Sequence, residues 1–183
     1  MSEINNYSEE DLYSICLLVM NVQNIMIYSD GKFDDSELWI LSSYLGGINK
    51  MPLDPLDSIF KLWNKNGVSY TTKISDESIS ILNKFTKEGV DPYSEEAFEI
   101  MFEKGLEVID KLSVKQKQDF VTGIYGFTLH ITHADTVVDK GETLTSLDIT
   151  KYFLNKLQLP SNLVLSVDKD FRSLGGDEGF VYQ

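Results

Sequence analysis

The predicted fold is organised around the stretch Asp30-Gly31-Lys32-Phe33-Asp34-Asp35-Ser36-Glu37. A second stretch with the same skeleton reads Asp135-Thr136-Val137-Val138-Asp139-Lys140-Gly141-Glu142. Each copy has an Asp, three residues, a second Asp, two residues and a Glu, with an apolar residue just before the second Asp. The first copy ends a long apolar segment near the N-terminus, and the second ends a comparable segment near the C-terminus. The two stretches therefore predict a pseudo-symmetric pair of helix–turn–helix corners.

Helix signals dominate the rest of the chain. Apolar residues recur at helical spacing, and Ser or Asp caps with acids in the first turn mark the starts of helices. Seven predicted helices begin near Ser8, Asp34, Asp54, Ser75, Ser94, Ser113 and Asp139. Glycines end four of them, at positions 31, 46–47, 67 and 89, and the last helix runs to about Gln158. Residues 68–74 are β-branched and polar, which favours an extended linker. We therefore expect one all-α bundle over residues 1–160.

The C-terminal stretch 161–183 lacks this periodicity, and we expect it to be a tail that is docked on the bundle or disordered. Trp39, Trp63 and the many Phe and Tyr residues are predicted to lie in the core. An exposed subset of them would instead mark a groove for a partner.

Composition restricts the possible functions. The chain has 183 residues, enough for one domain with a sizeable core, and a formal net charge of −13. That charge argues against nucleic-acid binding, which requires a basic face. Cys16, the only cysteine, lies among apolar residues and is predicted to be a buried, inert thiol. The most apolar run, residues 15–22, is too short to cross a bilayer, and no secretory signal is visible, so we expect a cytoplasmic protein.

The acidic residues allow two interpretations. Asp34 with Glu37, and Asp139 with Glu142, have the spacing of helix N-terminal caps. Alternatively, six carboxylates from the two stretches converge and hold a hard divalent cation such as Ca²⁺ or Mg²⁺. These six are Asp30, Asp34, Glu37, Asp135, Asp139 and Glu142. An EF-hand loop fits poorly, because Met26 and Tyr28 would occupy its first and third ligand positions.

The two stretches resemble a D-G-x-[apolar]-[D/S]-x-x-E motif of the TerB-like family, whose members are associated with resistance to tellurite and other stresses. The resemblance covers about residues 8–160, with Ser29 and Thr136 departing from the usual small residue and glycine. It implies an all-α bundle, no enzymatic activity, and a metal-binding role for the acidic residues. The family's domain also occurs beside J-domains, which implies a co-chaperone-like alternative.

Other chemistry is weakly indicated. His130 and His133 lie one turn apart with Asp135 nearby, a spacing that a transition-metal site can use, although such histidines are more often structural. No sequence motif for phosphate binding or hydrolysis is present. We therefore expect a non-enzymatic stress-response accessory protein that binds a divalent cation. The alternative is a protein-interaction scaffold whose acidic motifs are only helix caps.

Overall fold

The computed structural model describes residues 7–29, 35–51, 53–134 and 140–160, and the side chains within these ranges except those of 140–143. Within this part of the chain the protein is all-α, with seven helices and no strand. They are α1 (Glu9–Tyr28), α2 (Asp35–Leu45), α3 (Leu56–Lys65), α4 (Gly67–Glu88), α5 (Glu95–Asp110), α6 (Val114–Thr132) and α7 (Lys140–Lys156). The predicted fold class is confirmed.

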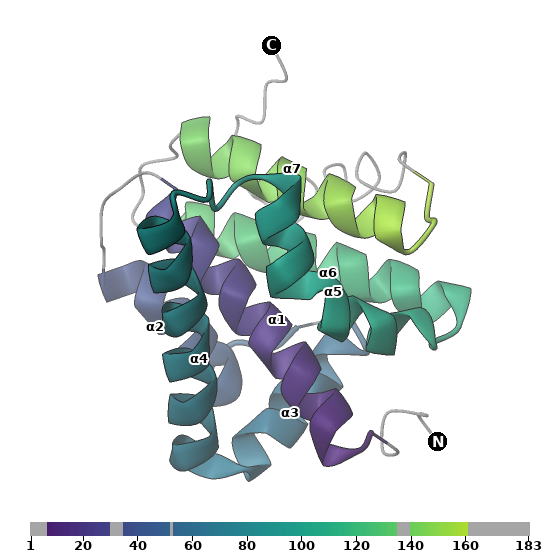
Figure 1. The fold of residues 1–183 in the computed structure, drawn as a ribbon. Coiled ribbons are helices and arrows are strands. Elements are labelled where there is room, and N and C mark those ends of the chain that lie inside the picture. The colour runs from purple at the N-terminus through teal and green to yellow at the C-terminus, as the bar shows by residue number, and fades with distance from the viewer. Residues whose placement is uncertain (1–6, 30–34, 52, 135–139, 161–183) are drawn as a thin grey trace.

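Helix α1 is the centre of the bundle, and it packs against each of the other six helices (Figure 1). It is apolar around most of its circumference, and its buried side chains include Ile15, Leu18, Val22 and Ile25. By length and composition α1 could cross a membrane, but most of it is buried inside the bundle. That burial is typical of the core helix of a soluble protein.

Local sequence signals place several helix ends as predicted. The hydroxyl of Ser8 accepts a hydrogen bond from the Asp11 backbone N–H at the start of α1, and Ser94 caps α5 in the same way through Ala97. Ser113 and Gln116 form a reciprocal capping box at the start of α6. These bonds satisfy backbone donors that have no partner within the helix.

The predicted linker at residues 68–74 is wrong, as is the predicted helix start near Ser75. Helix α4 runs unbroken from Gly67 to Glu88. The hydroxyl of Thr72 donates to the Val68 carbonyl one turn back, at 3.0 Å. Ile74 is buried against the core, and the Tyr70 ring meets Tyr13 of α1 edge-on, with 5.8 Å between the ring centroids. Packing on α1 therefore overrides the weak β preference of this segment.

The predicted cap at Asp54 is also wrong. The helix begins at Leu56, and the Asp54 carboxylate accepts a hydrogen bond from the Ser58 hydroxyl, at 2.7 Å, rather than from a backbone N–H.

The core combines aromatic side chains with one very close helix approach. Trp63, Phe102, Phe120, Phe127 and Phe153 are essentially inaccessible to solvent. Helices α1 and α5 come so close that a Cβ built on Gly105 would lie 2.7 Å from Leu18 Cβ and 2.9 Å from the Ser14 carbonyl oxygen. Cys16 is buried, as predicted, and burial raises the pKa of its thiol well above the usual range.

Trp39 does not belong to this core. Its side chain on α2 is 51% exposed, so the prediction that both tryptophans are buried holds only for Trp63.

Candidate functional site

Most of the predicted metal-binding carboxylates lie outside the described residues. This holds for Asp30, Asp34, Asp135 and Asp139, and the side chain of Glu142 is likewise not described. Glu37 is described: it lies in the first turn of α2 and is 2% exposed. Within the described ranges, no three His, Cys, Asp or Glu side chains are grouped so that they could hold a metal ion. The six-carboxylate site stays a prediction.

The helices that lead into the two acidic stretches end on the same side of the bundle (Figure 1). Helix α2 contacts both of them near their C-terminal ends. The Gln23 side-chain oxygen of α1 accepts a hydrogen bond from the Leu41 backbone N–H, at 3.1 Å. One turn further along α2, the Tyr44 hydroxyl is hydrogen-bonded to Nδ1 of His130 in α6, at 3.0 Å. Helices α1 and α6, which precede the two acidic stretches in the chain, therefore both contact α2 within their last two turns.

The two hairpins that contain the acidic stretches also have polar bonds at corresponding positions. In the second hairpin the Thr128 hydroxyl of α6 and the Ser146 hydroxyl of α7 are 2.5 Å apart and buried. The spacing between Asp30 and Asp135 also separates Gln23 from Thr128, and Leu41 from Ser146. This correspondence agrees with a repeated hairpin. The pseudo-symmetry of the two corners stays a prediction, since their loops are not described.

Both histidines are hydrogen-bonded within the bundle. The His130 ring also meets the Tyr44 ring edge-on, and Tyr44 in turn stacks on Phe60 with 5.2 Å between ring centroids. Burial lowers the pKa of His130, and the nearby His133 lowers it further. Nδ1 of His133 lies 2.7 Å from the Leu129 carbonyl oxygen, to which it can donate. These bonds give both rings a structural role, while Asp135, the third group of the predicted transition-metal site, lies outside the described residues.

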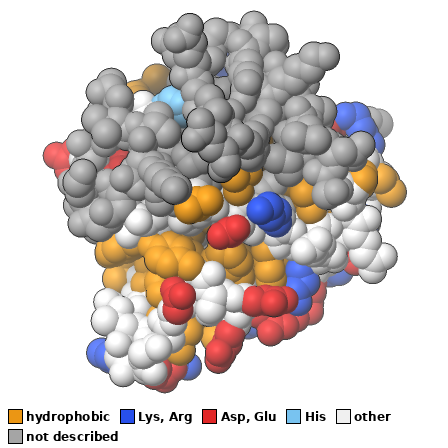
Figure 2. All heavy atoms as spheres, turned by 90° about the horizontal axis from the view of Figure 1, so that it is seen from above, with side chains coloured by type: hydrophobic (Ala, Val, Ile, Leu, Met, Phe, Trp, Pro, Cys, Tyr) orange, Lys and Arg blue, Asp and Glu red, His pale blue; other side chains and the backbone are white. Residues whose placement is uncertain are grey.

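The strongest candidate site in the described residues is a groove of about 590 Å³ between α2 and α4, with α1 as its floor. We call it the α1–α2–α4 groove. Four large apolar side chains line it and remain exposed, namely Tyr28 of α1 (44%), Leu38 of α2 (38%), and Val68 (82%) and Ile79 (42%) of α4. Hydrophobic side chains are also visible between acidic ones on the face seen in Figure 2.

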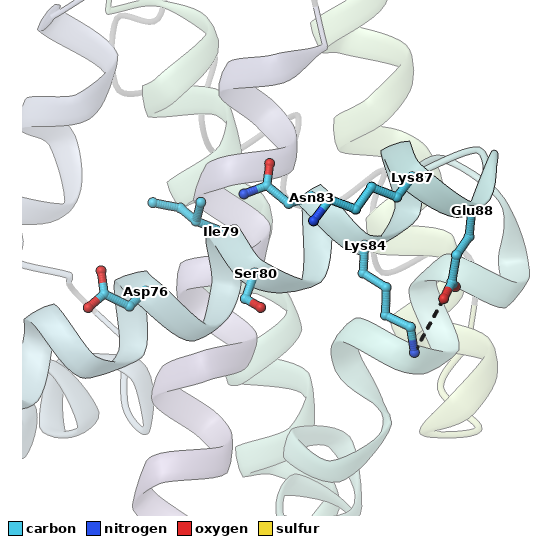
Figure 3. Close-up of a pocket in the computed structure, with 7 residues that line it drawn as sticks. All are labelled: Asp76, Ile79, Ser80, Asn83, Lys84, Lys87 and Glu88. Carbon is cyan, nitrogen blue, oxygen red and sulfur yellow. Dashed lines mark ion pairs between the residues drawn. The ribbon is translucent and has the colours of Figure 1, made fainter.

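The outer face of α4 continues this groove. A shallower hollow there shares Asp76 and Ile79 with the groove, and Figure 3 shows that all seven of its lining residues come from α4. Lys84 and Glu88 form an exposed ion pair across it, at 4.0 Å. Because this hollow shares two lining residues with the groove, we treat it as an extension of the groove rather than as a separate site.

A third hollow adjoins the opposite end of the groove, between the C-terminal end of α2 and α3. The two share Leu45, Gly46 and Asn64. Three lysines line the third hollow, Lys50, Lys61 and Lys65, together with one carboxylate, Asp57, which forms an ion pair with Lys61. The groove therefore has a carboxylate, Asp76, toward one end, whereas the hollow beyond its other end has two more lysines than carboxylates.

Sequence reasoning missed this groove because it treated residues 68–74 as a linker. If residues 67–88 are read as one helix, then positions 68, 72, 75 and 79 share a face. The residues there are Val, Thr, Ser and Ile. That uncharged stripe was the signal in the sequence.

Comparisons of the chain with protein-family models, with curated proteins and with solved structures found no match. The resemblance to the TerB-like family therefore stays a prediction based on the two acidic stretches.

Proposed function

We propose that this chain is a non-enzymatic accessory protein that binds another protein through the α1–α2–α4 groove. The observation that carries the proposal is the exposure of Tyr28, Leu38, Val68 and Ile79 around one depression. Apolar side chains that line a single groove are a mark of interaction sites, whereas scattered ones need no explanation. Trp39, the next residue on α2, is also exposed but does not line the groove.

Site-specific photo-crosslinking tests this proposal. A photoreactive phenylalanine analogue replaces Val68 in the groove, and a matched variant carries it at Val114, an exposed apolar residue (63%) at the start of α6. After irradiation of cells that produce each variant, we expect discrete protein adducts from position 68 and none of the same mass from position 114. Identical adduct patterns, or no adduct from position 68, would refute a partner site in the groove.

Divalent cation binding is the second candidate function. It is favoured by the neighbouring C-terminal ends of α1 and α6 and by the corresponding polar bonds of the two hairpins. The proposed ligands are the six carboxylates of the two acidic stretches, with Ca²⁺ or Mg²⁺ as the ion. Together with a cytoplasmic location and a role in stress or tellurite resistance, this is the function that the TerB-like resemblance implies.

Thermal unfolding of chelator-treated protein tests the cation proposal, with Ca²⁺, Mg²⁺, Mn²⁺ and Zn²⁺ added separately. An ion that binds only the folded protein stabilises it by about 2.7 kcal/mol at a concentration of about 100 times Kd. We expect at least one ion to raise the midpoint, and the double variant Asp30→Ala/Asp135→Ala to abolish the rise. A midpoint that does not respond to any ion would leave these carboxylates as helix caps.

A further inference from the structure

We propose that the occupant of the α1–α2–α4 groove is an amphipathic helix of a partner protein. It lies antiparallel to α4, with an apolar stripe facing the groove and a basic residue in its N-terminal half next to Asp76. This inference rests on the proposed function, protein binding through the groove. It adds the secondary structure, the charge and the direction of the bound segment.

The length of the groove fits a short helix. On α4 the lining residues run from Gly67 to Ile79, which is about three and a half helical turns or roughly 18 Å. An amphipathic helix bound in a groove contacts it through side chains at positions i, i+3 or i+4, and i+7. Leu38, Leu41 and Leu45 on the opposite wall have this spacing along α2. Both walls therefore present side chains at helical intervals to the space between them.

Four of the polar side chains that line the groove are hydrogen-bonded within the protein, and their bonds favour a helix over an extended peptide. On the floor, Gln23 accepts from the Leu41 backbone N–H, and Asn24 donates to the Ser78 hydroxyl at 2.8 Å. On the α4 wall, the Thr71 hydroxyl accepts from the Trp63 indole N–H at 3.0 Å, and the Thr72 hydroxyl donates to the Val68 carbonyl. These four side chains are already bonded within the protein. An extended peptide needs partners for its backbone groups, whereas a helix satisfies its own.

The charge within the groove selects a basic residue on the bound segment. Asp76 is the only Asp, Glu, Lys or Arg among its described lining residues. The two other helices that form the groove, α1 and α2, contain no Lys or Arg. A chain with a net charge of −13 also attracts a basic partner at long range and repels an acidic one.

The lysines at the far end give the bound helix a direction. The C-terminal end of a helix carries a partial negative charge and its N-terminal end a partial positive charge. Beyond the Asn64 end of the groove lie three lysines and one carboxylate, namely Lys50, Lys61, Lys65 and Asp57. Toward the Ile79 end the charges of Asp76, Lys84, Lys87 and Glu88 cancel, and Asp76 is the one that lines the groove itself. A helix whose C-terminus lies toward the lysines and whose N-terminus lies near Asp76 is favoured at both ends. Since α4 runs from Gly67 toward Glu88, this direction is antiparallel to α4.

The test uses two synthetic helical peptides of about 14 residues and the full-length protein. Both peptides carry the same leucine stripe at i, i+3, i+7 and i+10. One has two lysines in its N-terminal half, and the other has two glutamates at those positions. Fluorescence anisotropy measures both affinities. We expect the lysine peptide to bind about fivefold tighter than the glutamate peptide, as a change in the sign of an exposed charge pair allows.

Three variants separate the parts of the inference. Asp76→Lys should reverse the preference between the two peptides, because it replaces the carboxylate with an ammonium group. Val68→Asp should weaken both peptides about tenfold or more, because it places a charge against the apolar stripe. Val114→Asp, the matched control on α6, should change neither affinity. Val68 is 82% exposed, so its variant should unfold at the same temperature as the parent protein, which excludes misfolding as the cause.

The direction has its own readout. A nitroxide spin label on the N-terminus of the lysine peptide should broaden the amide resonance of Ile79 more than that of Lys65. The opposite pattern would overturn the antiparallel direction. Equal binding of the two peptides, or an Asp76→Lys variant with an unchanged preference, would overturn the charge assignment. If neither peptide binds while Val68 still gives crosslinked adducts, then the helical occupant is wrong and protein binding through the groove stands.

Discussion

Helices α1 and α4 have nearly the same length, 20 and 22 residues, but opposite surroundings. Thirteen residues of α1 are buried, whereas only Ile74, Ser78 and Phe85 of α4 are. Helix α1 is therefore held by contacts on every side, and its sequence is apolar around most of its circumference. Helix α4 is held along one narrow stripe, and the rest of its surface is available to a partner. In this comparison α1 accounts for stability and α4 for the candidate site.

Removing an apolar side chain should produce the largest difference in the free energy of unfolding between variants of α1 and variants of α4. Ile25 of α1 is inaccessible to solvent, and Ile25→Ala should lower the free energy of unfolding by about 2–5 kcal/mol, because it leaves a cavity. Ile79→Ala on α4 should change it by less than about 0.5 kcal/mol, because that side chain is partly exposed. Urea unfolding of both variants measures the difference. Equal losses would show that α4 contributes to the core as much as α1 does.

The close approach of α1 and α5 should make added volume costly as well. Gly105→Ala should destabilise the protein by about 1–3 kcal/mol, because the new methyl group would meet Leu18 and the Ser14 backbone. The matched variant Gly126→Ala, on α6, places its methyl group in open space and should stabilise the helix by about 0.5–1 kcal/mol. Thermal unfolding compares the two. A neutral Gly105→Ala would mean that α1 and α5 move apart readily, contrary to a rigid central helix.

The hydrogen bond between Asn24 and Ser78 joins the two compared helices directly, and it is buried. Each of Asn24→Ala and Ser78→Ala should cost about 1–2 kcal/mol, since each leaves the partner group without this bond. The double variant should lose less than the sum, with a coupling of at least about 0.5 kcal/mol. Strictly additive losses in urea unfolding would show that this bond does not attach α4 to α1.

Substitutions at the starts of α1 and α4 should show the smallest difference in the free energy of unfolding. Ser8 caps α1, so Ser8→Ala should cost about 1 kcal/mol. Asn66 makes no side-chain cap bond to α4 and instead donates an exposed hydrogen bond to the Leu62 carbonyl of α3, at 2.9 Å, so Asn66→Ala should cost less than Ser8→Ala. Both are measured by urea unfolding. A larger loss at Asn66 would reverse this part of the comparison.

The effect of Ser8 should also depend on pH. The Ser8 hydroxyl donates to the Asp11 carboxylate, which is the main cause of the lowered pKa of Asp11, and Lys111 lowers it further. A carboxyl with a lowered folded-state pKa adds stability above its unfolded pKa of about 3.8, and that stability is lost as the pH falls further. The difference between Ser8→Ala and the parent should therefore narrow below about pH 3.8. A constant difference would assign the whole effect to the backbone cap.

Much of the fold could be predicted because its signals are local. The caps at Ser8, Ser94 and Ser113 each depend on a hydrogen bond within one helical turn, and Gly89 ends α4 with the positive φ of 69° that glycine tolerates best. The start of α4 could not be predicted in this way. The first two turns of α4 gain their stability from contacts with Trp63 and with α1. Helix propensity does not include contacts between helices.

The candidate sites also include one that the sequence indicated and one that it did not. The acidic stretches were visible as a repeated pattern, but their side chains, apart from Glu37 and those of the flanking residues Asp35 and Ser36, lie outside the described residues. The groove was missed, because its uncharged stripe on α4 lay partly in the segment interpreted as a linker, and because the other residues that line it come from different helices.

The sequence alone determined the all-α class, the order of the helices and the burial of Cys16. Each of these follows from hydrophobic periodicity, composition or a cap that operates over a few residues. Only the tertiary structure decided that Trp39 is exposed while Trp63 is buried, and that α2 and α4 flank α1 with a gap between them. Both helices pack on α1, and the gap lies between them. The side chains that face it can be identified only once the relative positions of three helices are known.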